Sequence, residues 1–221
     1  MTAREDILGR IGAALADVPA DELPDDVTVE RGYERSLGLD ADGLRDLLTE
    51  RVADYQAVAR VVEADALTAA LGEACGRHGA SRLVVPADLP EAWRPPDVEL
   101  VPDDGLANEA LDTVDGVLTG CCAAIAETGT IVLDGGARQG RRALTLVPDL
   151  HLCVVEVSQI VGTVPEAFER LAPAARERRP FTFISGPSAT SDIELSRVEG
   201  VHGPRRLEVF IIRGPDTKRA A

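Results

Sequence analysis

The sequence predicts an α/β protein built on a mostly parallel sheet that is covered by helices. Segments rich in Val, Ile and Leu alternate with segments of helical periodicity, and this β-α-β order is typical of parallel sheets with right-handed crossovers. Aromatic residues make up only 3% of the 221 residues while 45% are hydrophobic. The core must therefore be mainly aliphatic, as it is around buried parallel strands.

The elements follow one another with clear helix and strand signals. Asp40 is a suitable N-cap for a helix that continues to Tyr55. Thr163-x-Pro-Glu166 combines a capping box with a proline in the first turn of another helix. Two further helices are expected at about 67–75 and 106–114, and strands at 57–62, 82–85, 98–101, 116–120, 130–133, 150–155, 181–184 and 207–212.

The first 38 residues form a helical arm and an acidic connector. Thr2-x-x-Glu5 has the form of a capping box, and apolar residues follow it at helical spacing to Leu15. This periodicity stops at about residue 17 and resumes only after residue 38. We expect a single α/β domain over residues 39–213 and a loose tail over 214–221. The arm either docks on another subunit or is a solvated helix.

The charge and the cysteines restrict the class of protein. The formal net charge of −15 argues against binding to nucleic acid or to an anionic membrane surface. The N-terminus carries acids where a signal peptide needs an apolar run, so we expect a cytoplasmic protein. The four cysteines show no Cys-x-x-Cys spacing, and we expect free thiols and no metal or other cofactor in this chain.

The first candidate site is the stretch around Glu127. This carboxylate follows a run without charge that extends back to Asp115. Three small residues come directly after it and are candidate substrate-binding residues: Thr128, Gly129 and Thr130. A carboxylate in apolar surroundings must be hydrogen-bonded, paired or kept at an edge of the protein. Glu127 is therefore either a functional acid or a turn acid between two strands.

The second candidate is the glycine-rich segment 135–142, which ends in Arg142. It matches neither a phosphate-binding loop nor a dinucleotide fingerprint. Glycines allow close approach of the backbone to a ligand, and a guanidinium binds a carboxylate through two hydrogen bonds. The segment is either an anion pocket for a small organic acid or a solvated loop.

The third candidate is a turn that is dense in hydroxyl groups after the strand at 181–184. In open α/β sheets ligands bind at the carboxyl ends of the strands, and a helix start there would favour an anion. The alternative is that Ser191 or Asp192 only caps that helix. His202 lies in a tight turn near this end, whereas His151 lies within a strand and fits a core histidine. The candidate binding residues here are Ser185, Gly186, Ser188, Thr190, Asp192 and His202.

Three motifs together resemble the lactate-utilization protein C family, whose domain is often called LUD. They are Ala-Glu-Thr-Gly-Thr at 126–130, Phe-Ile-Ser-Gly-Pro-Ser-x-Thr-x-Asp-Ile-Glu at 183–194 and Gly-Val-His-Gly-Pro at 200–204, with Arg142 between them. The resemblance implies a three-layer α/β fold with helices on both faces of the sheet, similar to the glucosamine-phosphate deaminase, ribose-phosphate isomerase and CoA transferase group. It also implies a part in oxidising L-lactate to pyruvate together with iron–sulfur partner proteins.

These observations give two hypotheses of function. In the first, the chain binds lactate or pyruvate through Arg142 and the hydroxyl-rich turn, and Glu127 is the general base or an orienting carboxylate, because losing the hydroxyl proton requires a base. In the second, it is a non-catalytic assembly or regulatory subunit whose arm docks on a partner. An acyl or phosphosugar enzyme is disfavoured because the sequence has no phosphate loop and no CoA signature.

Overall fold

The computed structural model describes residues 2–19, 21–23, 26, 28–30, 32–191, 197–199 and 203–213. The chain divides into two compact units, Met1–Tyr33 and Glu34–Ala221. The boundary lies five residues before the one expected from the sequence. Residues just after the boundary already pack within the second unit, since the Thr163 hydroxyl donates to the Arg35 carbonyl at 3.1 Å. The expected tail at 214–221 lies outside the described residues.

The first unit contains the predicted helical arm, α1 (Ala3–Ala14). Its predicted capping box is confirmed: the Glu5 N–H donates to the Thr2 hydroxyl at 3.3 Å, and the Thr2 N–H donates to the Glu5 carboxylate at 2.7 Å. None of the residues of α1 is buried. The apolar side chains on its stripe are about half exposed; they are Ile7, Leu8, Ile11 and Leu15.

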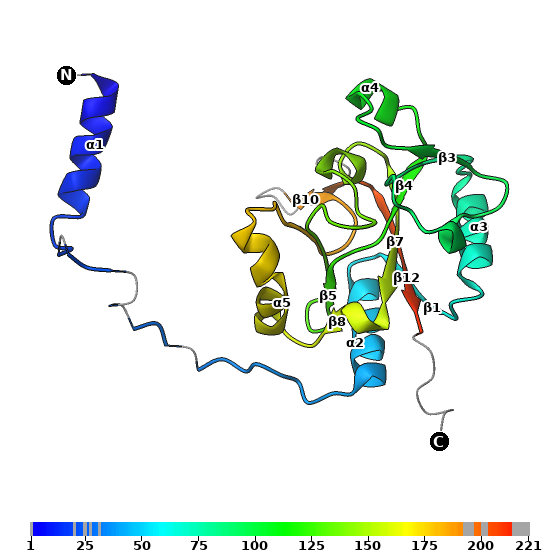
Figure 1. Ribbon diagram of the computed structural model, residues 1–221, viewed down its shortest axis with the longest axis horizontal. Coiled ribbons are helices and arrows are strands. Elements are labelled where there is room, and N and C mark those ends of the chain that lie inside the picture. Colours follow the sequence, from blue (N-terminus) through cyan, green and yellow to red (C-terminus); the bar gives the residue numbers. More distant parts are fainter. Residues whose placement is uncertain are drawn as a thin grey trace. The chain divides into compact units, whose positions relative to one another are not determined.

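A six-stranded parallel sheet forms the centre of the second unit, as the sequence predicts (Figure 1). All its neighbouring strands pair in parallel. The longest strands, β7 and β12, lie side by side in its interior. In spatial order the strands are β1 (Val58–Val62), β12 (Arg206–Ile212), β7 (Leu150–Glu156), β4 (Gly116–Thr119), β2 (Arg82–Val85) and β3 (Glu99–Pro102).

A second sheet of four strands was not expected from the sequence. It contains β8 (Ile160–Val161), β5 (Ala123–Ile125), β6 (Thr130–Leu133) and β9 (Thr182–Ile184), in that order. The sequence was interpreted as two strands joined through the Glu127 segment. Instead, those strands, β4 and β6, belong to different sheets, and the short apolar run between them forms β5. β5 and β6 pair as an antiparallel hairpin.

The layers follow from which side chains each face buries. α3 (Leu67–His78) packs on one face of the six-stranded sheet, where Leu71 meets Leu152 and Phe210 in one apolar cluster. The opposite face is covered by α2 (Ala41–Asp54) and by the four-stranded sheet, and α5 (Val164–Arg176) covers the outer side of that second sheet (Figure 1). The prediction of helices on both faces is therefore incomplete, because a sheet contributes to one of the covering layers.

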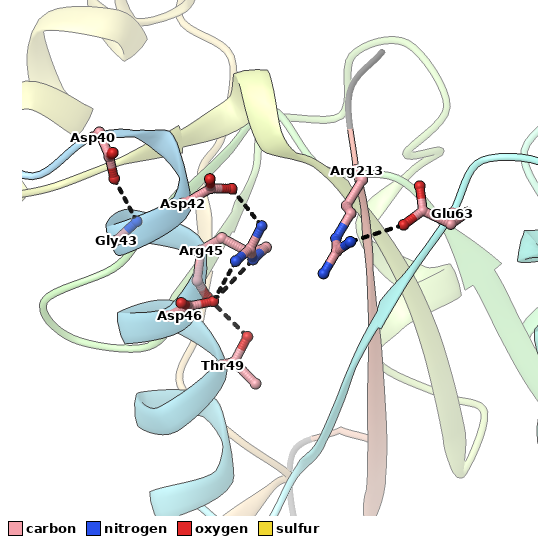
Figure 2. A network of polar contacts seen from close by, with 8 residues as sticks. All are labelled: Asp40, Asp42, Gly43, Arg45, Asp46, Thr49, Glu63 and Arg213. Carbon is pink, nitrogen blue, oxygen red and sulfur yellow. Dashed lines mark hydrogen bonds and ion pairs between the residues drawn. The ribbon is translucent and has the colours of Figure 1, made fainter. Parts of the chain in front are cut away.

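The helix signals in the sequence are largely confirmed. The N-cap of α2 is Asp40, whose carboxylate accepts from the Gly43 N–H at 2.9 Å (Figure 2). Leu48 and Val52 on its inner face are buried and stabilise the fold by about 1.5–3 kcal/mol each. The remaining short helices are η2 (Glu91–Trp93), α4 (Asn108–Leu111), η3 (Arg142–Thr145) and η4 (Val157–Gln159).

The described part of the hydroxyl-rich turn leads into a strand, and residues 192–196, where the expected helix would begin, lie outside the described residues. Residues Ala189–Ser191 form the strand β10, which pairs antiparallel with β11 (Arg197–Glu199). β-branched and small hydroxyl residues fit an extended backbone as well as a helix cap, so the local sequence did not distinguish the two.

A buried carboxylate holds one end of the sheet against α3. Glu208 on β12 is only 1% exposed. One of its carboxylate oxygens, Oε1, accepts from Arg60 on β1 at 2.5 Å and from Arg77 on α3 at 2.6 Å. His78 lies 3.1 Å from the other oxygen. Burial raises the pKa of Glu208, but the hydrogen bonds from Arg60 and His78 and the charge of Arg77 outweigh it, so the net pKa is lowered.

We predict that Glu208→Gln lowers the free energy of unfolding by about 3 kcal/mol at neutral pH, because it removes the negative charge that Arg60 and Arg77 share and replaces one of its two acceptor oxygens with an NH2 group. The folded-state pKa of Glu208 lies below its unfolded value, so this stabilisation is present above about pH 4 and is lost as the pH falls through the folded value. Chemical denaturation across that pH range measures it. Glu99→Gln, which removes an exposed ion pair with Arg82, is the control and should change little.

Candidate functional site

A cavity of about 220 Å³ opens beside the hydroxyl-rich turn. Its volume is below that of pockets for drug-sized ligands and suits a molecule of a few heavy atoms. The residues around it come from η3, from the start of β7, from β9 and the segment after it, and from the start of β12 and the segment before it. They are Arg142, Thr145, His151, Thr182, Phe183, Ile184, Ser185, Gly186, Pro187, Ser188, Gly203, Pro204 and Leu207.

The cavity lies at the amino ends of the central strands. His151 and Leu207 are the second residues of β7 and β12, and Gly203 and Pro204 directly precede β12. We expected a site at a carboxyl end, and this holds only for β9, which belongs to the second sheet. The expectation failed for the central sheet because β9 pairs with β6 rather than with a strand of that sheet.

Among the described residues that line the cavity, Arg142 is the only arginine. One of its terminal nitrogens, Nη1, donates to the Thr145 carbonyl at 2.8 Å and lies 3.1 Å from the Thr145 hydroxyl. Within the described residues no carboxylate pairs with Arg142. In contrast, the neighbouring Arg141 is paired to Asp103 through Nε at 2.8 Å and Nη2 at 3.0 Å. The structure thus leaves the positive charge of Arg142 available to an anion in the cavity.

A chain of hydroxyl groups connects the Glu127 turn to the cavity. The Thr128 and Thr130 hydroxyls lie 2.8 Å apart, and the Thr130 hydroxyl lies 2.7 Å from that of Ser185. Ser185 lies in the wall of the cavity. Two of the predicted binding residues after Glu127 therefore support the cavity from behind, through Ser185.

His151 is a cavity residue that the sequence assigned to the core. It is 1% exposed, and its Nε2 lies 2.8 Å from the hydroxyl of Thr119 on the neighbouring strand. Along β7 it shares a face with Cys153, while Leu150 and Leu152 point to the opposite face. The presence of a polar residue, His151, in a mostly apolar strand was the feature of the sequence that could have indicated a functional role. Burial of this residue did not by itself indicate a cavity.

Glu127 lies outside the cavity. It is exposed in the turn between β5 and β6, and its backbone N–H donates to the Gly162 carbonyl at 3.0 Å. Its carboxylate has no hydrogen bond or ion pair with any described residue. These surroundings fit the second interpretation of Glu127, a turn acid between two strands. The structure does not bring Glu127 together with Arg142.

The other predicted residues fall into three groups. Gly186 and Ser188 lie in the cavity wall with Ser185, and the Ser188 N–H donates to the Pro204 carbonyl at 2.8 Å. Thr190 belongs to β10, where its backbone pairs with Val198. Asp192 and His202 lie outside the described residues.

Two glycines near the cavity are required by close packing against α2 and the residue after it. Gly186 has a φ of +92°, and a Cβ there would lie 2.6 Å from the Tyr55 Cβ. Gly129 has a φ of +61°, and a Cβ there would lie 2.7 Å from the backbone of Arg51. Both glycines therefore allow a loop to approach the carboxyl-terminal end of α2.

The described residues show neither a metal-binding group nor a membrane span. No three or more of their His, Cys, Asp and Glu side chains gather where a metal ion could be held. None of their helices combines the length and the apolar character needed to cross a membrane.

Comparisons with known proteins find relatives over most of the second unit. A family profile described as LUD domain matches residues 39–212. A protein of Deinococcus radiodurans named "Lactate utilization protein C" is 52% identical over 164 residues, which cover 74% of this chain and 76% of that protein. A protein of the same name from Shouchella clausii is 29% identical, over 77% of this chain and 80% of its own length.

A solved structure agrees with the fold. The crystal structure of a duf162 family protein from Deinococcus radiodurans superposes with a TM-score of 0.70 at 43% sequence identity. The match covers 79% of this chain and 99% of that chain. The α/β architecture with a mostly parallel central sheet is therefore shared with a protein of known structure.

We predict that Gly129→Ala destabilises the protein more than Gly135→Ala. Both positions have a similar φ, +61° and +66°, so the conformational cost of alanine is about the same. Only at Gly129 does the Cβ meet backbone at 2.7 Å, whereas the nearest atom at Gly135 is 3.7 Å away. The difference should be about 1–3 kcal/mol in chemical denaturation. Equal losses would mean that the turn can move away from α2.

Proposed function

Because this chain belongs to the LUD domain family and is similar to proteins named lactate utilization protein C, we propose that it acts in lactate utilization. In this proposal the cavity beside Arg142 binds a small carboxylate, L-lactate or pyruvate. The observation that carries it is an arginine without a carboxylate partner among the described residues, placed in the wall of a cavity of matching size.

The geometry supports a division of roles within the cavity. Thr145 holds one nitrogen of the Arg142 guanidinium by hydrogen bonds, so that the guanidinium is already oriented when a carboxylate binds. The hydroxyl of Ser185 and the ring of His151 are polar groups for the oxygen on the second carbon of the ligand. A carboxylate and a neighbouring oxygen are common to both lactate and pyruvate.

Oxidation of L-lactate to pyruvate releases two electrons and two protons, and the electrons need an acceptor. We place this chain beside iron–sulfur partner proteins that take the electrons, in line with the family resemblance. Binding of the carboxylate is the step assigned to this chain. Glu127 is not part of that step, since it lies outside the cavity.

The proposal extends to the fold group. A parallel central sheet between covering layers supports similarity to the glucosamine-phosphate deaminase, ribose-phosphate isomerase and CoA transferase group. Superposition of the six central strands on members of that group, with the same strand order and direction, is the test.

We predict that Arg142→Gln weakens lactate and pyruvate binding by about 10- to 100-fold, as expected for the loss of charge-assisted hydrogen bonds. Isothermal titration calorimetry with each acid measures the effect. The control Arg141→Gln removes the adjacent arginine, which is paired to Asp103, and should leave affinity unchanged. Glu127→Gln should also bind normally. Equal affinity in Arg142→Gln and in the unmodified protein would remove the proposed site.

A second candidate function is assembly through the arm. Four large apolar side chains on one stripe of α1 are about half exposed, which is typical of a helix that buries this stripe against a partner. In this alternative the chain is a non-catalytic assembly or regulatory subunit of the same lactate-utilization system.

We predict that Ile11→Ser abolishes co-purification with the partner proteins of that system while lactate affinity stays the same. Asp6→Ser, on the opposite face of α1, is the control and should keep the partners bound. Co-purification that survives both Ile11→Ser and deletion of residues 2–15 would exclude the arm as the docking element.

A further inference from the structure

A cluster of buried polar side chains lies directly behind the cavity, between the two sheets. It consists of Thr119, Cys121, His151, Cys153 and Gln159, all at most 7% exposed. His151 belongs to both the cavity wall and this cluster, and its Nε2 is 2.8 Å from the Thr119 hydroxyl. The proposed binding function assigns no role to the two cysteines.

The pairing of β7 with β4 brings Cys153 close to the segment that contains Cys121. Cys153 on β7 is the direct partner of Thr119 on β4, and its Sγ lies 3.8 Å from the carbonyl of Gly120, the residue before Cys121. The Cys121 S–H donates to the side-chain oxygen of Gln159 at 3.5 Å, and each of the two sulfurs lies near enough to shift the pKa of the other. Gln159 fixes Cys121, because its amide donates to the Cys121 carbonyl at 2.6 Å.

The surroundings make the two sulfurs chemically unequal. The neighbouring Cys121 thiol lowers the pKa of Cys153 against the opposing effect of burial, and His151 and Thr119 lower it further. The Cys153 sulfur and burial raise the pKa of Cys121. Cys153 is therefore the sulfur of the pair that loses its proton more readily, which favours it as the nucleophile.

The other two cysteines lack such a partner. Burial raises the pKa of Cys75 to about 11 and that of Cys122 to about 12, so both remain thiols at neutral pH. Cys122 instead donates its S–H to the Val132 carbonyl at 3.1 Å. Any selective oxidation of this protein should therefore spare them.

We propose that Cys121 and Cys153 form a redox-active dithiol that closes to a disulfide when a peroxide enters through the cavity. The Cys153 thiolate attacks one oxygen of hydrogen peroxide, the O–O bond breaks, and hydroxide leaves to become water on protonation. The Cys121 sulfur then attacks the resulting sulfenic acid, its proton leaves, and the second oxygen departs as water. Two thiols and one peroxide give one disulfide and two waters.

The test uses the full chain and hydrogen peroxide. After oxidation at neutral pH the protein is alkylated with iodoacetamide, and its intact mass and tryptic peptides are measured. The expected product has two alkylated cysteines instead of four and a disulfide between the peptides of Cys121 and Cys153. Because Cys121 and Cys122 share a tryptic peptide, the assignment is made in Cys122→Ser.

Matched variants separate this pair from the other thiols. Cys75→Ser and Cys122→Ser should still form the disulfide, whereas Cys121→Ala and Cys153→Ala should not. His151→Phe should slow the reaction of Cys153 at least several-fold without preventing it, and the dependence of the rate on pH should shift to higher pH. Circular dichroism shows whether each variant is folded.

Three results would overturn the proposal. They are four free thiols after oxidation of the folded protein, a disulfide that contains Cys75 or Cys122, and oxidation of Cys153 to sulfinic acid while Cys121 stays alkylatable. None of these measurements involves lactate or pyruvate, so they stand or fall separately from the proposed binding function.

Discussion

The alternation of side chains along β7 is the constraint on which the rest of the structure depends. This strand pairs with β4 on one side and β12 on the other, and six of its seven residues are buried. The two ladders fix its register, and a slip by one residue would exchange its faces. With this register Leu150, Leu152 and Val154 point to α3, while His151 and Cys153 point between the sheets. Both the cavity and the thiol cluster follow from this one register.

The central sheet could be predicted because each of its strands is a continuous aliphatic run between turn or helix signals. This holds for β7 and β12, which have few alternative conformations compatible with burial. The strand β5 could not be separated from its neighbours, because Ala123–Ile125 is short and equally compatible with a loop or a helix. Missing β5 also concealed the second sheet, and with it the layer that forms one side of the cavity.

The candidate site was predictable only in part, for a geometric reason. Arg142 and Ser185 were selected by their chemistry, and the fold brings both to one cavity. Glu127 was selected for its isolation in an apolar run, but a hairpin turn exposes its side chain whatever the polarity of the flanking strands. His151 looked like a core residue because strand position gives burial but does not reveal an adjacent cavity. The sequence pattern therefore identified residues of suitable chemistry. Which of these residues lie together in the cavity depends on the pairing of β6 with β9.

The close approach of two loops to the end of α2 has a mechanical consequence. The Glu127 turn rests on Arg51 through Gly129, and the segment with Ser185 rests on Tyr55 through Gly186, one helical turn further along. The two loops also share the Thr130–Ser185 hydrogen bond. Both loops thus pack against the last turn of α2 and the residue after it. A tilt of this helix would therefore change the shape of the cavity, even though α2 contributes no residue to the cavity lining.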